Sequence, residues 1–480
     1  MQLFCFTFIF LVNLSIVSAQ TMVSSAEELK NALTKIEVGQ TIVWKNGTYR
    51  DIKINFNPKT IGKEKSPIIL KAETAGKVIF TGNSQLLVDG KYLQAEGFYF
   101  EGKSTLEKGD VMAFSTNSFK CRITNCAVKN YGPADDLANN NWISIQGIRN
   151  EIDHCYFSGK TNQGPYLVVR YKTADDFVPG SDNAPSTYHH IHHNYFGYRT
   201  MPTDNGGEDM RIGDSKTSFT HGFNIIEYNY FEDHRLEPEV ISNKSWDNIY
   251  RFNTFMNNDG SMVLRHGQKC FVYGNYFSGK TGRNMSGGIR VINANQTIFN
   301  NYLENLEGAV QERKAPICVM SGLLQSALNE YYPADSSIIA YNIVANSVGP
   351  AIVLGEGNAS KGKEFVDPQN ILLANNVVYN ITGKNNEAVK VMGNKTSYVF
   401  INNLYALCSS NYKGFEAVKT KEIKKVNGLN SIEQKENTAI INRINARLLI
   451  HHFQLTSKEI MQFNPAWRIA KANVGVNWMK

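Results

Sequence analysis

Ile225-Ile226-Glu227-Tyr228-Asn229-Tyr230-Phe231 joins a short apolar run to a phrase made of Asn and two aromatic residues. Similar phrases, in which a small polar residue precedes two mostly apolar ones, recur along the chain. They begin at Cys126, Cys155, Asn194, Asn229, Asn253, Asn275, Asn301, Asn342, Asn376 and Asn403. Successive copies are 22 to 41 residues apart, which matches one turn of a solenoid, with loops inserted into the longer turns.

The segments around this phrase have the composition of short strands. Ile225–Tyr228 and Thr297–Phe299 are rich in β-branched and aromatic residues, and no amphipathic helix pattern of ten or more residues occurs between about 75 and 410. We therefore predict an all-β fold, a single-stranded right-handed parallel β-helix. Equivalent strands would stack about 4.8 Å apart, with the Asn side chains forming an internal hydrogen-bonded ladder. The alternative is an antiparallel sandwich with chance Asn-aromatic pairs.

The two ends of the chain differ from this repeat. Leu3–Val17 is apolar and uncharged and precedes Ser18-Ala19-Gln20, so residues 1–20 are predicted to be a secretory signal peptide, with an N-terminal membrane anchor as the alternative. We expect a secreted or periplasmic protein. Ser24–Leu33 has the pattern of a capped amphipathic helix that covers the first turn of the solenoid.

The predicted domains are a parallel β-helix catalytic domain over 21–412 and a C-terminal cap or appendage over 413–480. Ile440–Ile450 has helical apolar spacing within that appendage. Its lysines are interpreted as a solvated face: Lys413, Lys419, Lys421, Lys424 and Lys425.

Composition narrows the functional classes. The 480 residues are 42% hydrophobic and 19% charged, which excludes a disordered chain, and the net charge of +7 permits a polyanionic partner. The cysteines form no CxxC pair, so a zinc knuckle is disfavoured. Cys126 and Cys155 occupy the same phase of neighbouring turns, where either a disulfide or buried thiols would fit, and we favour thiols.

Two acidic segments suggest a cation site. Asn205-Gly206-Gly207-Glu208-Asp209 is a turn rich in oxygen atoms, and Glu237-Pro238-Glu239 places two carboxylates on one side of an extended segment. Such carboxylates repel one another unless a cation lies between them. Oxygen ligands from Asn and Glu suit Ca²⁺ better than Zn²⁺. The alternative for Glu-x-Glu alone is a solvated strand face.

Lys244 and Arg265 are separated by 21 residues, close to one turn of the predicted coil. We expect them on adjacent rungs of one groove. A lysine beside a bound cation and an arginine has a lowered pKa, so that its neutral amine can act as a base. Taken singly, each side chain would more often be an ordinary surface charge.

The motifs over 205–290 resemble polysaccharide lyase family six, which contains alginate lyases and the dermatan-cleaving chondroitinase B. They are Asn205-Gly-Gly-Glu, Glu237-Pro-Glu-Val-Ile-Ser-Asn-Lys-Ser, Leu264-Arg-His-Gly and Gly287-Gly-Ile-Arg-Val. The resemblance covers roughly residues 22 to 410, and Val474-Gly-Val-Asn-Trp resembles a C-terminal motif of the family.

The resemblance implies calcium-assisted β-elimination on a uronate-containing polyanionic polysaccharide, and we favour alginate because most of the family acts on it. It assigns Asn205, Glu237 and Glu239 as calcium ligands, Lys244 as general base, Arg265 as general acid, and His266 and Arg290 as substrate contacts. We expect no nucleic-acid partner, and no membrane partner once the signal is removed. Inserted loops over 160–190 or 309–340 would decide between endo and exo cleavage.

Three other functions stay open at this stage. A dermatan sulfate lyase would use the same core residues. A glycoside hydrolase needs two carboxyl groups that flank the scissile bond, whereas Glu237 and Glu239 lie on one side of it. A non-catalytic carbohydrate-binding solenoid would not depend on Lys244.

Four histidines cluster in Tyr188-His189-His190-Ile191-His192-His193. Alternation along a strand separates His189 and His193 from His190 and His192. Because no cysteine or carboxylate lies beside them in the sequence, we expect structural or groove-lining histidines in preference to a transition-metal site.

Overall fold

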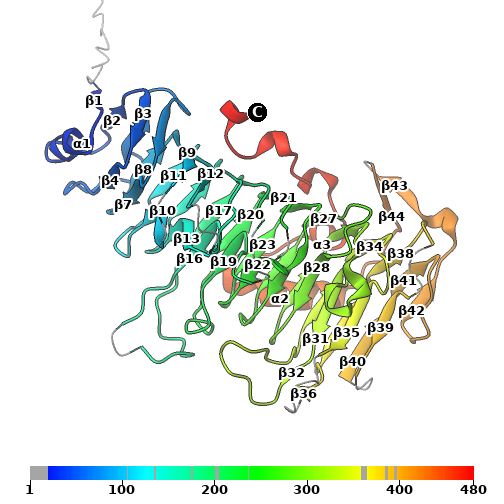
Figure 1. Ribbon diagram of the computed structural model, residues 1–480. Helices are drawn as coiled ribbons and strands as arrows, with labels where there is room; N and C mark the ends of the chain where they lie inside the picture. The colour runs from blue at the N-terminus through cyan, green and yellow to red at the C-terminus, as the bar shows by residue number, and fades with distance from the viewer. Residues whose placement is uncertain are drawn as a thin grey trace, which may run out of the picture.

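The computed structural model describes residues 20–104, 106, 108–133, 137–174, 177–200, 205–235, 237–357, 365–383, 387–393, 397–426 and 428–480. The predicted signal peptide lies outside these residues except for Gln20. Within the described chain, three long parallel sheets of 14, 14 and 12 strands wind into one coil (Figure 1). The predicted parallel β-helix is confirmed.

Each turn of the coil contributes one strand to sheet A, then one to sheet B and one to sheet C. Sheet A contains β1 (Thr21–Val23), β2 (Thr41–Trp44), β5 (Ile68–Ala72), β8 (Leu93–Glu96), β11 (Arg122–Thr124), β14 (Glu151–Asp153), β17 (His190–His192), β20 (Ile225–Glu227), β23 (Ile249–Arg251), β26 (Phe271–Tyr273), β29 (Thr297–Phe299), β33 (Ile338–Ala340), β37 (Ile371–Ala374) and β40 (Tyr398–Ile401).

Sheet B contains β3 (Gly47–Arg50), β6 (Val78–Thr81), β9 (Phe98–Lys103), β12 (Ala127–Gly132), β15 (Tyr156–Ser158), β18 (Tyr195–Phe196), β21 (Tyr230–Glu232), β24 (Thr254–Met256), β27 (Tyr276–Ser278), β30 (Tyr302–Glu304), β34 (Ile343–Ala345), β38 (Val377–Tyr379), β41 (Asn403–Ala406) and β42 (Phe415–Ala417).

Sheet C contains β4 (Lys53–Phe56), β7 (Gln85–Val88), β10 (Lys108–Phe114), β13 (Asn139–Ile145), β16 (Leu167–Val169), β19 (Met210–Ile212), β22 (Glu239–Asn243), β25 (Gly260–Leu264), β28 (Ser286–Val291), β31 (Ile317–Met320), β35 (Ile352–Glu356) and β39 (Val389–Val391). Two small antiparallel hairpins pair β32 (Gly322–Leu323) with β36 (Phe365–Val366), and β43 (Lys424–Val426) with β44 (Leu429–Ser431).

The corner between sheets A and B carries the ladder that the repeated phrase predicts. From Asn194 to Asn403, eight asparagines stack inside the coil, and each Nδ2 donates to Oδ1 of the next one at 2.9–3.1 Å. The backbone N–H of each donor residue points to the same Oδ1, as in Asn229 to Asn253 at 3.0 Å. Every rung is therefore tied to the next at one fixed point.

The second apolar position of the phrase forms the core. The rings of Phe231, Phe255 and Phe277 stack at centroid separations of 4.8 and 4.3 Å, and all three side chains are buried. Because corresponding residues recur one turn apart, identical side chains meet face to face. Cys126 and Cys155 occupy the corner in the earlier turns as buried free thiols, as the sequence predicts.

The N-terminal end is closed by α1 (Ala26–Leu33). The Ser25 hydroxyl caps this helix by accepting from the Glu28 N–H at 3.1 Å, and Leu29 and Leu33 bury against the first turns of the coil. The expected helical cap is confirmed.

The C-terminal segment runs back along the outside of the coil (Figure 1). Its helix α2 (Thr438–Leu448) packs Ile441 and Ile444 on the outer face of sheet A, against Phe271 and Phe299. Within the part of the chain that the structure describes, the remaining helices are α3 (Ser457–Met461) and the 3₁₀ turns η1 (Gly308–Val310), η2 (Glu312–Lys314), η5 (Thr420–Glu422), η6 (Leu449–His451), η7 (Pro465–Trp467), η8 (Lys471–Asn473) and η9 (Asn477–Met479).

The last residues reach the early turns. Trp478 lies against Tyr99 of sheet B with a ring-centroid separation of 5.4 Å, and its indole N–H donates to Asn125 at 3.1 Å. Residues 438–480 thus bind several turns together from outside. Within the described residues, no helix is long and apolar enough to cross a lipid bilayer.

Replacement of one ladder residue tests the role of the corner. Asn253→Ala removes the acceptor for the N–H and Nδ2 of Asn229, and buried donors left unpaired cost about 1–3 kcal/mol each. We expect the free energy of unfolding to fall by about 3 kcal/mol or more in urea titrations. The exposed control Asn473→Ala should change it by less than about 0.5 kcal/mol; equal effects of the two variants would contradict a ladder that stabilises the coil.

Candidate active site

Four of the residues singled out in the sequence lie on or directly after neighbouring strands of sheet C: Glu239, Lys244, Arg265 and Arg290. The strand β22 pairs in parallel with β25 so that Asn243 lies opposite Leu264. Lys244 directly follows β22 and Arg265 directly follows β25, so these two residues lie on adjacent rungs. Arg290 lies on β28, opposite Val263. The adjacent-rung prediction for Lys244 and Arg265 agrees with this register.

The segment before β22 is irregular, as Pro238 requires. The register shifts between Glu239 and Ile241, and again between Gly260 and Met262 on the next rung. Gly260 has φ +84°, and a Cβ there would lie 2.5 Å from the Glu237 carbonyl oxygen, so only glycine allows this approach. The bulge directs Glu237 and Glu239 toward the same side of the sheet as the loop at 205–209.

Three acidic side chains gather there. Glu208, Glu237 and Glu239 are each at most 5% exposed. Burial raises the pKa of Glu237 to about 8, the negative charges of Glu208 and Glu239 add to this effect, and the Gly207 N–H, which donates at 3.0 Å, opposes it. Among the described residues, Oε2 of Glu208 has no hydrogen-bond partner. The Arg211 guanidinium lies 4.0 Å from this oxygen, and the charge of Arg199 lowers the pKa of Glu237 by less than burial raises it. Nearby cations therefore do not outweigh the burial of Glu237.

Buried cations and a buried histidine hold the acidic segments in place. The Arg199 guanidinium donates to the Glu208 carbonyl at 2.8 Å and is fully buried. His234 lies 3.0 Å from an Asp209 carboxylate oxygen through Nδ1 and 3.2 Å from the Glu237 carbonyl through Nε2. These contacts fix the backbone of both segments, so the carboxylates stay close despite their repulsion.

Glu239 differs from Glu237 because it is paired. Its Oε1 accepts from Arg265 at 2.7 Å and from Arg290 at 2.9 Å. Burial acts to raise the pKa of Glu239, but the two guanidinium groups outweigh it and bring the value to about 2. For Arg265, burial acts to lower the pKa, and Glu239 outweighs this, so the net shift is upward. Arg265 therefore stays charged.

Lys244 is the one amine in this group. Its side chain is half-buried, and this burial lowers its pKa, with Arg265 and Arg211 acting in the same direction and Glu208 and Glu239 opposing. Its neighbour Asn243 is anchored inside the coil by Asn248 at 2.9 Å and Tyr250 at 2.8 Å, which fixes the end of β22. Lys244 thus carries a larger neutral fraction at neutral pH than a free lysine does.

A loop between β32 and β33 lies over this group. The carbonyl of Glu330 accepts from Nε2 of His266 at 2.7 Å, and the ring of Tyr331 lies 4.9 Å from the Arg265 guanidinium and 6.0 Å from that of Arg290. Burial, with the charge of Arg265, lowers the pKa of His266 to about 4. His266 is therefore neutral, with Nε2–H donating to the carbonyl.

The two regions that the sequence indicates as inserted loops approach each other. Gly180 of the first loop lies so near Leu328 of the second that a Cβ on Gly180 would be 2.9 Å from Leu328 Cδ2. Figure 1 shows the two loops leaving the coil on the same side. Tyr331 was not predicted, because nothing in its own sequence neighbourhood signals a contact with residues 66 positions earlier. From the sequence, Glu208 was predicted only to belong to an oxygen-rich turn.

The histidine cluster lies elsewhere. His190 and His192 are on β17 of sheet A, on the outer face of the coil, where they contact Glu227 and Glu151, so of the two expected roles the structural one fits them and the groove-lining one does not. His189 is buried, and its Nδ1 accepts from the Asn150 N–H at 3.1 Å, as a structural histidine does.

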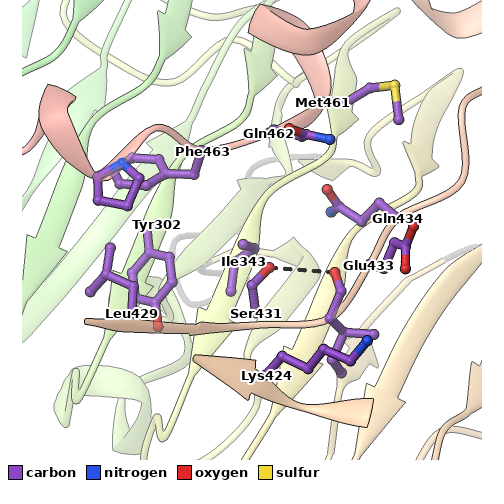
Figure 2. Close-up of a pocket in the computed structure, with 12 residues that line it drawn as sticks. Tyr302, Ile343, Lys424, Leu429, Ser431, Glu433, Gln434, Met461, Gln462 and Phe463 are labelled. Atoms are coloured by element: carbon purple, nitrogen blue, oxygen red, sulfur yellow. Dashed lines mark hydrogen bonds between the residues drawn. The ribbon is translucent and has the colours of Figure 1, made fainter. Parts of the chain in front are cut away.

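A pocket of about 300 Å³ lies outside sheet B, between β44 and the segment that follows α3. Figure 2 shows Tyr302, Phe463 and Lys424 around it. It contains none of the clustered acidic, lysine and arginine residues described above, so its size does not make it the catalytic centre.

The comparisons with known proteins concern the family and the fold of the chain. The sequence model of the chondroitinase B family matches residues 23–447. The solved structure of AlyGC, an alginate lyase of polysaccharide lyase family 6, is 31% identical with a TM-score of 0.82, over 96% of this chain and 59% of AlyGC. A mannuronic acid specific family 6 lyase from human gut microbiota is 28% identical, with a TM-score of 0.72, over 84% of this chain and 91% of that one.

A third structure, Pedsa3628 of Pseudopedobacter saltans, is 24% identical with a TM-score of 0.67, over 92% of this chain and 99% of that one, and shares the fold. No curated protein sequence matches. Fold and site together define a polysaccharide lyase architecture. This chain belongs to polysaccharide lyase family 6, the chondroitinase B family; it spans 59% of the length of AlyGC.

The acidic cluster predicts a pH dependence of stability. Because the folded-state pKa of Glu237 is raised to about 8, the folded state holds a proton that the unfolded state releases near its ordinary value of 4.5. In chelator-treated protein, the stability contributed by this proton is present at pH 4 and is lost as pH rises toward 8.

Glu237→Gln should flatten this dependence and stabilise chelator-treated protein at pH 8 by an amount that urea titration resolves. The exposed control Glu416→Gln should leave the profile unchanged. If the urea midpoints of wild type and Glu237→Gln differ equally at pH 5 and pH 8, the proposed protonation of Glu237 is refuted.

Proposed function

We propose that this protein is a secreted lyase that cleaves alginate by calcium-assisted β-elimination, with Lys244 as the base and Arg265 as the acid. The observation that carries this proposal is the convergence of a half-buried amine with a lowered pKa, a charged guanidinium and three buried carboxyl groups at adjacent strands of sheet C and the segments that precede them. A hydrolase with flanking carboxyl groups does not require such an amine.

The donor set fits a hard divalent cation. Glu237 is held in a neutral state only by burial and by neighbouring carboxylates, and Oε2 of Glu208 lacks a hydrogen-bond partner within the described chain. Asn205, Glu237 and Glu239 would hold Ca²⁺, with Glu208 beside them. When bound, the ion neutralises the uronate carboxylate of the substrate and stabilises negative charge that develops at C5.

The remaining chemistry belongs to the side chains of this chain. Neutral Lys244 takes the C5 proton of the uronate, and the electron pair of that bond forms the C4–C5 double bond as the C4–O4 bond breaks. Arg265 donates a hydrogen bond or a proton to the departing O4. The Glu239 carboxylate and the ring of Tyr331 hold its guanidinium in position.

His266 and Arg290 have supporting roles in this scheme. Arg290 shares Oε1 of Glu239 with Arg265, so the two cations face the substrate side from neighbouring rungs. The Glu330 carbonyl fixes the ring of His266, whose Nδ1 is buried and has no hydrogen-bond partner among the described residues.

Substitution of the base gives the most direct test. Lys244→Ala should lower turnover by about 100- to 10,000-fold, because proton abstraction by a positioned group contributes that range. The assay follows the ultraviolet absorbance of the unsaturated uronate product. Lys216→Ala, a change at an exposed lysine, should retain full activity; near-normal turnover in Lys244→Ala would eliminate this mechanism.

Calcium binding can be measured apart from activity. We expect Ca²⁺ to raise the melting temperature of chelator-treated protein at pH 8, since an ion that binds only the folded state stabilises it. Glu237→Gln should reduce this shift strongly, while Glu416→Gln should not. An unchanged melting temperature in saturating Ca²⁺ would contradict the assigned ligands.

Dermatan sulfate is the second candidate substrate, because the matching family bears the name of chondroitinase B. The alginate relatives of known structure favour alginate. Incubation with each polymer, with and without chelator, should give a calcium-dependent rise in absorbance with alginate. A rise with dermatan sulfate alone would reassign the substrate and keep the mechanism.

A further inference from the structure

The outer face of sheet A carries a second cluster of ligand-type side chains, remote from sheet C. The parallel register pairs Glu151 of β14 with His190 of β17, and His192 with Glu227 of β20. The intervening Ile191 points into the core and is buried. Two histidines from one rung therefore lie between carboxylates from the rungs on either side.

The atoms are close enough to share one ion. One ligand atom from each of Glu151, His190 and His192 lies within 4.8 Å of the other two. Nε2 of His192 is 3.0 Å from Oε1 of Glu151, and the two imidazole rings have centroids 4.0 Å apart. A tetrahedral ion with bonds of about 2 Å needs ligand atoms about 3.3 Å apart, which small rotations of these side chains supply.

Charge and access also suit a cation. The side chains of His190 and Glu151 are 40% and 36% exposed, so an ion can enter from solvent. Among the described residues, carboxylates outnumber guanidinium groups in this cluster, since Glu151, Asp153 and Glu227 form ion pairs with two guanidinium groups, those of Arg122 and Arg251. With neutral histidines, one negative charge remains.

The neighbouring contacts resemble the support that protein metal sites use. Nδ1 of His192 lies 2.8 Å from Nδ1 of His193, which fixes the ring and leaves Nε2 directed at Glu151. The ring of His193 is held between His154 and Tyr228, with centroid separations of 5.0 and 5.1 Å. A second nitrogen that is fixed in this way orients the ligating nitrogen.

We propose that Glu151, His190 and His192 bind a divalent transition metal of the zinc class on the outer face of sheet A. A water molecule completes the coordination, and Oε1 of Glu227, which lies 2.8 Å from Nε2 of His190, is held beside the site by Arg251. Two imidazoles and a carboxylate select Zn²⁺ over Ca²⁺, so this site is independent of the proposed calcium site. The ion joins β14 to β17 across the chain segment that contains the first inserted loop.

The test uses tag-free full-length protein, stripped with chelator and titrated with Zn²⁺ by calorimetry in excess Ca²⁺. We expect one equivalent to bind and the melting temperature to rise. His192→Ala should weaken binding by about 100-fold or more, and His193→Gln, which alters only the supporting contact, by about 10-fold. The control His452→Asn, at an exposed histidine outside the cluster, should bind as wild type does.

Two results would overturn the proposal: no Zn²⁺ binding by the wild type, or equal affinity in wild type and His192→Ala. Glu151→Gln preserves the side-chain shape, so it replaces His192→Ala if that variant misfolds, and it should also weaken binding. The visible spectrum of Co²⁺-loaded wild type gives a measurement that needs no variant. Tetrahedral absorption bands support the site, and the spectrum of hydrated Co²⁺ refutes it.

Discussion

The hydrogen bond between stacked asparagine side chains at the corner of sheets A and B is the constraint on which the rest of the structure depends. Each amide donates to the next one and each oxygen also accepts a backbone N–H, as between Asn253 and Asn275. A turn cannot slip by one residue without breaking this contact and moving its core side chains to the outer face. The corner therefore sets the register of all three sheets.

Fixed register converts sequence separation into spatial position at the site. Lys244 and Arg265 become neighbours because their rungs are stacked, and Glu239 reaches Arg290 two rungs away. The two glutamates of this site differ in their protonation. Glu239 is ionised by its arginines, whereas Glu237 is protonated by burial beside Glu208 unless a cation replaces the proton. One cluster thus holds a carboxyl group with a raised pKa, a carboxylate with a lowered pKa and a lysine with a lowered pKa.

The inserted loops add features that the regular turns of the coil lack. The regular turns provide the platform, and the loops around Gly180 and Leu328 meet above it and place Tyr331 on the arginines. The C-terminal segment is not an insertion between turns. Its helix α2 and Trp478 cover outer faces of sheets A and B without entering the coil. Part of sheet A before the region covered by α2 remains accessible, and there the histidine and glutamate side chains of the second cluster lie.

The sequence by itself determined the parallel coil, the Asn ladder, the capping helix at 26–33 and the adjacent-rung placement of Lys244 and Arg265, because each follows from a repeat or a motif local in the chain. Only the tertiary structure decided the burial of Glu208 beside Glu237, the contact of Tyr331 with Arg265 and the carboxylates beside His190 and His192. Those contacts join residues tens of positions apart through loops of irregular length, and a burial-driven pKa depends on everything packed around the group. Neither such contacts nor such a pKa shift produces a periodic pattern in the sequence.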